Sequence, residues 1–97
     1  MKVLLINPIF TRYSGIKGSC GAYPPLGLGY IASFLREKKA YYDISLLDAE
    51  ALALSYEDIV SEVKKKQPDI VGITSSTPVF GHVLKIAESI KKALPHV

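Results

Sequence analysis

The sequence predicts an α/β domain built on an open parallel sheet with helices on both faces. Three short runs of branched apolar residues recur along the chain, at residues 2–6, 43–48 and 70–74. Near-continuous apolar runs of this kind are typical of strands that are covered on both faces. A stretch with helical spacing of its apolar residues follows each run. Strands that alternate with helices favour a parallel sheet with right-handed crossovers.

The first strand is expected at residues 2–6, and the first helix begins after Pro24-Pro25. Proline suits a helix start because its φ angle is already helical and its missing N–H needs no partner there. The apolar stripe that should face the sheet consists of Leu28, Ile31, Ala32 and Leu35.

The second strand, residues 43–48, leads into a helix with a clear start signal. Ser55 can cap the helix, and Asp58 follows three residues later, as a capping box requires. The helix should end before Pro68. Its apolar stripe consists of Ile59, Val60 and Val63.

The third strand, residues 70–74, is followed by a third helix. We expect Ser76 or Thr77 to cap this helix, with Pro78 in its first turn. Its apolar face should contain Phe80, Val83, Leu84, Ala87, Ile90 and Leu94.

The commonest arrangement of three such units is a three-layer, Rossmann-like or flavodoxin-like sheet with strand order 2-1-3. Ligands of these folds bind beyond the carboxyl ends of the strands, where the strand order reverses. That rule points to the loop after the first strand, residues 8–23, and to the loop after the third. The first loop is longer than most connections, and loops of that length are often functional.

The loop after the third strand is rich in hydroxyl groups. Four consecutive residues carry one, and the start of a helix follows. Hydroxyls and free helix N–H groups suit a polar or anionic ligand group. The alternative is that one hydroxyl caps the helix and the others meet water. The residues are Thr74, Ser75, Ser76 and Thr77.

Other candidate sites are weaker. Gly15, Gly18 and Gly21 lack the spacing of a dinucleotide or P-loop motif. Asp48 could meet a ribose hydroxyl, but an aspartate there more often caps its own loop. Neither histidine, His82 nor His96, has a metal-ligand partner at useful spacing, so no metal site is expected.

Composition narrows the class of protein. The single cysteine, Cys20, rules out an internal disulfide or an iron–sulfur site within the 97 residues. No apolar stretch approaches the ~20 residues of a membrane span, and we expect a cytoplasmic protein. The net charge is only +3, and its densest cationic run, residues 64–66, falls at a helix end without aromatic neighbours, so nucleic-acid binding is not expected.

Four segments together resemble a known family. They are KVLLINP at residues 2–8, YPPLGL at 23–28, LLDA at 46–49 and PDIVGITSST at 68–77. The set is similar to the N-terminal cobalamin-binding domain of cobalamin-dependent radical S-adenosylmethionine enzymes. That family includes anaerobic magnesium-protoporphyrin monomethyl ester cyclases and many radical methyltransferases. The resemblance extends over essentially the whole chain.

The resemblance implies that the carboxyl edge of the sheet faces one side of the corrin ring. A downstream barrel in the same polypeptide would lie against the other side and would hold an iron–sulfur cluster and S-adenosylmethionine. The chain itself would be non-catalytic, and its parent would be an oxidative cyclase or a methyltransferase. The residues placed against cobalamin by the resemblance are Asn7, Pro8, Tyr23, Thr74, Ser75, Ser76 and Thr77.

Two departures refine this expectation. Cobalamin domains of the methionine-synthase type carry a cobalt-ligating histidine after the first strand, whereas residues 7–12 here read NPIFTR. Cobalamin would therefore bind without a protein imidazole from this loop. Related domains also continue into a fourth strand, so residues 1–97 are interpreted as the N-terminal part of the domain, truncated before that strand. The unpaired edge of the third strand would then favour self-association.

Two other functions stay open at this point. Hydroxyls at Thr11, Ser14 and Ser19 could serve a flavodoxin-like binder of another phosphorylated ligand, such as flavin mononucleotide. Alternatively, the domain could be a ligand-free module that docks against the catalytic barrel.

Overall fold

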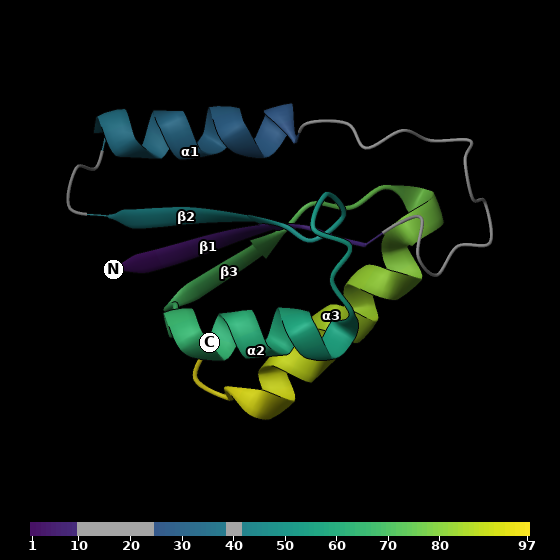
Figure 1. The fold of residues 1–97 in the computed structure, drawn as a ribbon. Coiled ribbons are helices and arrows are strands. Elements are labelled where there is room, and N and C mark those ends of the chain that lie inside the picture. Colours follow the sequence, from purple (N-terminus) through teal and green to yellow (C-terminus); the bar gives the residue numbers. More distant parts are fainter. Residues whose placement is uncertain (10–24, 39–41) are drawn as a thin grey trace.

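A parallel sheet of three strands forms the centre of the structure (Figure 1). The strands are β1 (Lys2–Asn7), β2 (Asp43–Asp48) and β3 (Ile70–Ile73), and they lie in the order β2-β1-β3. The predicted fold class and strand order are therefore confirmed. The computed structural model describes residues 1–9, 25–38 and 42–97.

The helices lie on both faces of the sheet, which gives three layers (Figure 1). α1 (Leu26–Lys38) covers one face, and α2 (Tyr56–Lys66) and α3 (Phe80–Ala93) cover the other. A single 3-10 turn, η1 (Thr77–Val79), precedes α3. The strand-to-helix connections therefore leave the sheet in both directions, as a doubly wound fold requires.

Alternation along β1 divides the apolar core into two clusters. Leu4 and Ile6 point to the layer of α2 and α3 and are fully buried. Val3 and Leu5 point to α1, where they pack with Leu28, Ala32 and Ile44. The cluster under α1 is the smaller of the two. The larger cluster contains Leu4, Ile6, Ile9, Leu47, Ala49, Ile59, Val63, Ile86, Ile90 and Leu94.

The predicted start of α2 is confirmed. The Ser55 side-chain oxygen accepts a hydrogen bond from the Asp58 backbone N–H at 3.1 Å, and the Asp58 carboxylate accepts one from the Ser55 N–H at 3.1 Å. The helix ends at Lys66, and Gln67 adopts a left-handed conformation (φ 47°) before the buried Pro68. Capping of this kind satisfies backbone groups that a helix end leaves without partners.

The predicted start of α3 is wrong in detail. η1 intervenes, so the N-cap position of α3 is Val79, and the Ser76 side chain makes no capping hydrogen bond. The carbonyl of Ser76 instead accepts the Val79 N–H at 3.1 Å. The Ser76 hydroxyl is thus left outside the helix.

The predicted apolar faces of α1 and α3 are only partly correct. Leu28 and Ala32 are buried, but Ile31 is 49% exposed. On α3, Phe80 and Leu84 are exposed, whereas Ile86, which the prediction omitted, is buried. The residues chosen from spacing alone mixed two flanks of α3. The flank that meets α2 and the sheet carries Ile86 and Ile90.

Candidate ligand-binding edge

The carboxyl ends of β1 and β3 lie side by side, and the chain leaves them in opposite directions. The chain runs from β1 to α1 on one face and from β3 to α3 on the other. Adjacent strands whose connections diverge in this way leave a crevice between them, and this crevice is where open α/β sheets bind ligands. The structure therefore places the candidate site at the ends of β1 and β3.

At the carboxyl end of β2, the polar groups are paired with one another by hydrogen bonds, so we call this end closed. The side-chain amide of Asn7 donates to Asp48 Oδ1 at 2.9 Å, and the Ala51 N–H donates to the same oxygen at 3.1 Å. The Ala49 N–H donates to the Asn7 carbonyl at 3.0 Å. Asp48 thus stabilises the turn after β2, and the Asn7 amide is oriented by Asp48.

The end of β3 is open. Thr74, Ser75, Ser76 and Thr77 are all exposed. The Thr74 N–H continues the sheet by donating to the Ile6 carbonyl at 3.2 Å, and the Ser75 hydroxyl donates to the Ser76 carbonyl at 3.2 Å. Because Ser76 caps no helix, this loop presents a row of hydroxyls rather than a set of capping groups.

The start of the loop after β1 is anchored in the core. Asn7 is half-buried, Pro8 is buried and Ile9 is almost completely buried. The Pro8 side chain is therefore packed inside the structure next to this edge and carries no polar group. Tyr23 lies outside the described residues, as do Thr11, Ser14, Ser19 and Cys20. The structure thus brings together Asn7, Pro8 and the β3 loop from the predicted set.

Sequence reasoning missed a contact between the first turns of α2 and α3. The Tyr56 hydroxyl and His82 Nδ1 lie 2.5 Å apart, and their rings are stacked with centroids 6.2 Å apart. The ammonium of Lys85 lies 4.9 Å from the centre of the Tyr56 ring. Tyr56 follows the β2 loop and His82 follows the β3 loop, so this contact joins the starts of the two helices that come after these loops. Local spacing gives no sign of a pair 26 residues apart.

No group of three or more histidine, cysteine, aspartate or glutamate side chains could hold a metal ion within residues 1–9, 25–38 and 42–97. Over the same residues, every helix is too short or too polar to cross a membrane.

Comparison with known proteins shows which family the chain matches. The model of the B12 binding domain matches residues 19–97. An uncharacterized methyltransferase of Pyrococcus horikoshii is 40% identical over an alignment 107 residues long, gaps included. The alignment covers 100% of this chain and 22% of that protein. No solved structure gives a significant match.

Two further relatives carry more specific names. An anaerobic magnesium-protoporphyrin IX monomethyl ester cyclase of Cereibacter sphaeroides is 30% identical, covering 93% of this chain and 15% of its own length. A cytidylyl-2-hydroxyethylphosphonate methyltransferase of Streptomyces wedmorensis is 36% identical, covering 92% of this chain and 20% of its own. The chain thus spans 15–22% of the length of the curated relatives that it matches.

Proposed function

Because the chain belongs to the B12-binding domain family, we propose that it is the cobalamin-binding part of a longer radical S-adenosylmethionine enzyme. The observation that carries this proposal is the open hydroxyl loop after β3, beside the divergence of β1 and β3. Catalysis would belong to a downstream domain, which would supply the iron–sulfur cluster and bind S-adenosylmethionine. The part of the chain described here would hold and orient the corrin.

The groups at this edge fit a corrin ring. The rim of a corrin carries amide side chains, which both donate and accept hydrogen bonds, and a hydroxyl can do the same. The exposed Thr74, Ser75, Ser76 and Thr77 would meet these amides. When bound, cobalamin would supply a cobalt centre that can carry a methyl group.

We further propose that no histidine of this chain ligates cobalt. The chain has two histidines, and neither lies between Asn7 and Tyr23. His82 Nδ1 contacts the Tyr56 hydroxyl. His96 lies next to Val97, which lines a groove with Asp69 and Ile70 at the opposite end of β3. An axial imidazole from the loop after β1 is thus absent from the sequence.

The substrate of the parent enzyme is proposed to depend on residues outside this chain. Relatives that match nearly the whole chain include a cyclase and two methyltransferases, and the reactions in their names differ. A domain common to all three fits a role in holding a shared cofactor.

The proposal is tested by titrating hydroxocobalamin into the complete polypeptide and recording its visible spectrum. Replacing Thr74 by tryptophan should weaken cobalamin binding by at least about tenfold, because a bulky side chain would occupy the corrin position; tenfold corresponds to about 1.4 kcal/mol. The control is Ser61→Trp, which changes an exposed hydroxyl residue on α2, away from this edge.

Three results would contradict the proposal. The first is no binding of hydroxocobalamin by the wild-type polypeptide, and the second is equal binding by the Thr74→Trp and Ser61→Trp variants. Nitrogen hyperfine splitting in the electron paramagnetic resonance spectrum of bound cob(II)alamin, lost on replacement of His82 or His96, would contradict the absence of a histidine ligand. A parallel titration with flavin mononucleotide tests the phosphorylated-ligand alternative by quenching of flavin fluorescence.

A further inference from the structure

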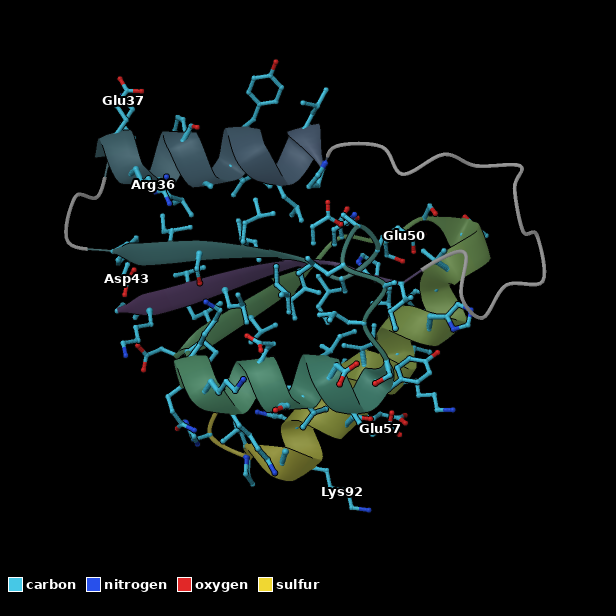
Figure 2. The ribbon with its side chains drawn as sticks, viewed as in Figure 1. Arg36, Glu37, Asp43, Glu50, Glu57 and Lys92 are labelled. Atoms are coloured by element: carbon cyan, nitrogen blue, oxygen red, sulfur yellow. The ribbon has the colours of Figure 1, made fainter. Side chains whose placement is uncertain are left out.

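α1 exposes large apolar side chains on the side that faces away from the sheet. Figure 2 shows Glu37 pointing away from the sheet, whereas Arg36 is directed toward it. A helix turns by about 100° per residue, so Leu26 and Tyr30 lie within about 20° of Glu37 around its axis. Phe34 lies about 60° from Glu37. Three large apolar residues therefore share the outward side of α1 with a carboxylate.

These three side chains form one row, which we call the α1 ridge. Leu26, Tyr30 and Phe34 are spaced by four residues, which places each side chain next to the following one along a helix. They are 66%, 75% and 59% exposed, whereas Leu28 and Ala32 on the opposite side of α1 are buried. Single apolar residues are common on surfaces, but a contiguous apolar patch is typical of an interaction site.

A shallow row of small residues runs beside the α1 ridge. Gly29 and Ser33 occupy the neighbouring row of four-residue spacing, which ends at Glu37. A Cβ atom placed at Gly29 would meet no other described group within 4 Å, so nothing in the described fold requires glycine there. Glycine also weakens a helix relative to alanine. Its presence fits a close approach of another molecule to this side of α1.

The α1 ridge and the shallow row are complementary to each other when two copies of α1 pack face to face. Helices pack by placing a row of side chains of one helix in the groove between two rows of the other. A two-fold axis near residues 30–31 would place Tyr30 of each copy between Gly29 and Ser33 of the other. Such a contact is isologous, because the same surface serves both copies.

Charge favours the antiparallel orientation that a two-fold axis across the helices produces. Glu37 lies in the last turn of α1, and the first turn of α1 carries no acidic residue. The start of a helix carries a partial positive charge and its end a partial negative charge. An antiparallel pair brings Glu37 of each copy toward the positive end of the other α1, whereas a parallel pair would bring it toward the negative end.

We propose that two copies of the polypeptide associate through the outward side of α1, with the α1 ridge of each copy packed against Gly29 and Ser33 of the other. This inference goes beyond the proposed cobalamin function and does not require it. The contact uses no residue of the open end after β3, so a dimer of this kind leaves that end free for a ligand.

The size of this surface predicts a weak dimer. An aromatic side chain buries ~150–250 Å² when fully covered, so the exposed parts of the three ridge residues amount to roughly 350 Å² per copy. With the small residues beside the ridge, two copies would bury about 1,000 Å² in total, which is the lower end of specific interfaces. We therefore expect a dissociation constant of about 10–100 µM.

Sedimentation velocity of the complete polypeptide, without cobalamin and over a range of concentrations around this value, tests the proposal. We expect a reversible equilibrium between monomer and dimer. Tyr30→Glu should raise the dissociation constant at least about tenfold, because two carboxylates would meet close to the two-fold axis. The matched control is Leu84→Glu, at an exposed apolar site on α3, which should leave the dissociation constant unchanged. Both sites are exposed, so both variants should fold.

Gly29→Ala separates the contact from the stability of the monomer. The added methyl group has free space in the described fold and suits a helix, so the thermal unfolding temperature should stay the same or rise. The same methyl group fills part of the shallow row, so the dissociation constant of the dimer should rise by about threefold or more. An unchanged dissociation constant would contradict the packing of Tyr30 beside Gly29.

Several outcomes would overturn the proposal. One is a monomer at every concentration, whether or not another segment of the polypeptide covers α1. Another is equal weakening of the dimer by Tyr30→Glu and Leu84→Glu. A dimer that is lost in Ile70→Glu and kept in Tyr30→Glu would assign the contact to the border of β3 instead. The outcome is separate from the hydroxocobalamin titration, because copies can associate where cobalamin fails to bind, and the reverse.

Discussion

The ends of β2 and β3 lie at the same edge of one sheet but differ in how their polar groups are used. After β2, Asp48 Oδ1 accepts hydrogen bonds from Asn7 and from the Ala51 N–H. After β3, Thr74 and Ser76 expose hydroxyls that cap no helix. The comparison suggests that polar residues at the carboxyl edge divide into groups that hold the edge together and groups that remain available to a ligand.

The largest effect on stability is expected at the closed end. Asp48→Ala removes an acceptor shared by two donors and should lower the free energy of unfolding by about 1–3 kcal/mol, because the half-buried Asn7 amide loses its partner and the exposed Ala51 N–H loses the hydrogen bond that closes the turn. Urea denaturation of the complete polypeptide measures this change. Asp48→Asn keeps an acceptor at the same position and should lower the free energy of unfolding by less than Asp48→Ala does. An equal decrease in the two variants would show that the two hydrogen bonds do not cause the loss of stability.

A smaller effect is expected where the two loops are joined. Tyr56→Phe removes the hydroxyl that contacts His82 Nδ1 and should cost about 0.5–1.5 kcal/mol. A double-mutant cycle with His82→Ala isolates the hydrogen bond, because His82→Ala should cost less in the Tyr56→Phe background than in the wild type, although the stacked rings still lose their contact. Additive losses would mean that Tyr56 and His82 act independently. If the contact positions the β3 loop, the Tyr56→Phe variant should also bind hydroxocobalamin more weakly.

The smallest effect on stability is expected at the open end. Ser76→Ala removes an exposed hydroxyl that caps no helix, so the free energy of unfolding should change by no more than about 0.5 kcal/mol. Thermal unfolding followed by circular dichroism checks this. Ser55→Ala removes a real N-cap and should cost about 1 kcal/mol, which makes it the matched control. An equal loss of stability in the two variants would show that the Ser76 hydroxyl stabilises a helix start as the Ser55 hydroxyl does.

The sequence was informative wherever a signal is local. Apolar runs located the three strands, and the Ser55–Asp58 spacing located the start of α2, because both depend on residues a few positions apart. Alternation of strands and helices predicted the parallel sheet, and the commonest arrangement of such units supplied the strand order, which is confirmed. The match of the B12 binding domain model confirms the family that the four motif segments indicated.

Features that depend on distant residues were not predictable in the same way. The burial of Ile86 and the exposure of Ile31 depend on which flank of a helix meets its neighbours, and spacing alone leaves that choice open. The pairing of Asn7 with Asp48 joins residues 41 positions apart, and η1 displaced the expected cap of α3. The cobalamin contacts assigned to Asn7, Pro8 and the β3 loop remain predictions.

The outer side of β3 has a consequence for handling the protein. Within the part of the chain that the structure describes, β3 pairs with β1 alone, and a groove of about 260 Å³ runs beside Ile70, Val71 and Ile73 toward α3. Backbone groups on such a border can accept a strand from another molecule. When the 97-residue chain is concentrated, pairing of two molecules should remove soluble protein with second-order kinetics. A charged substitution at Ile70 should slow this association.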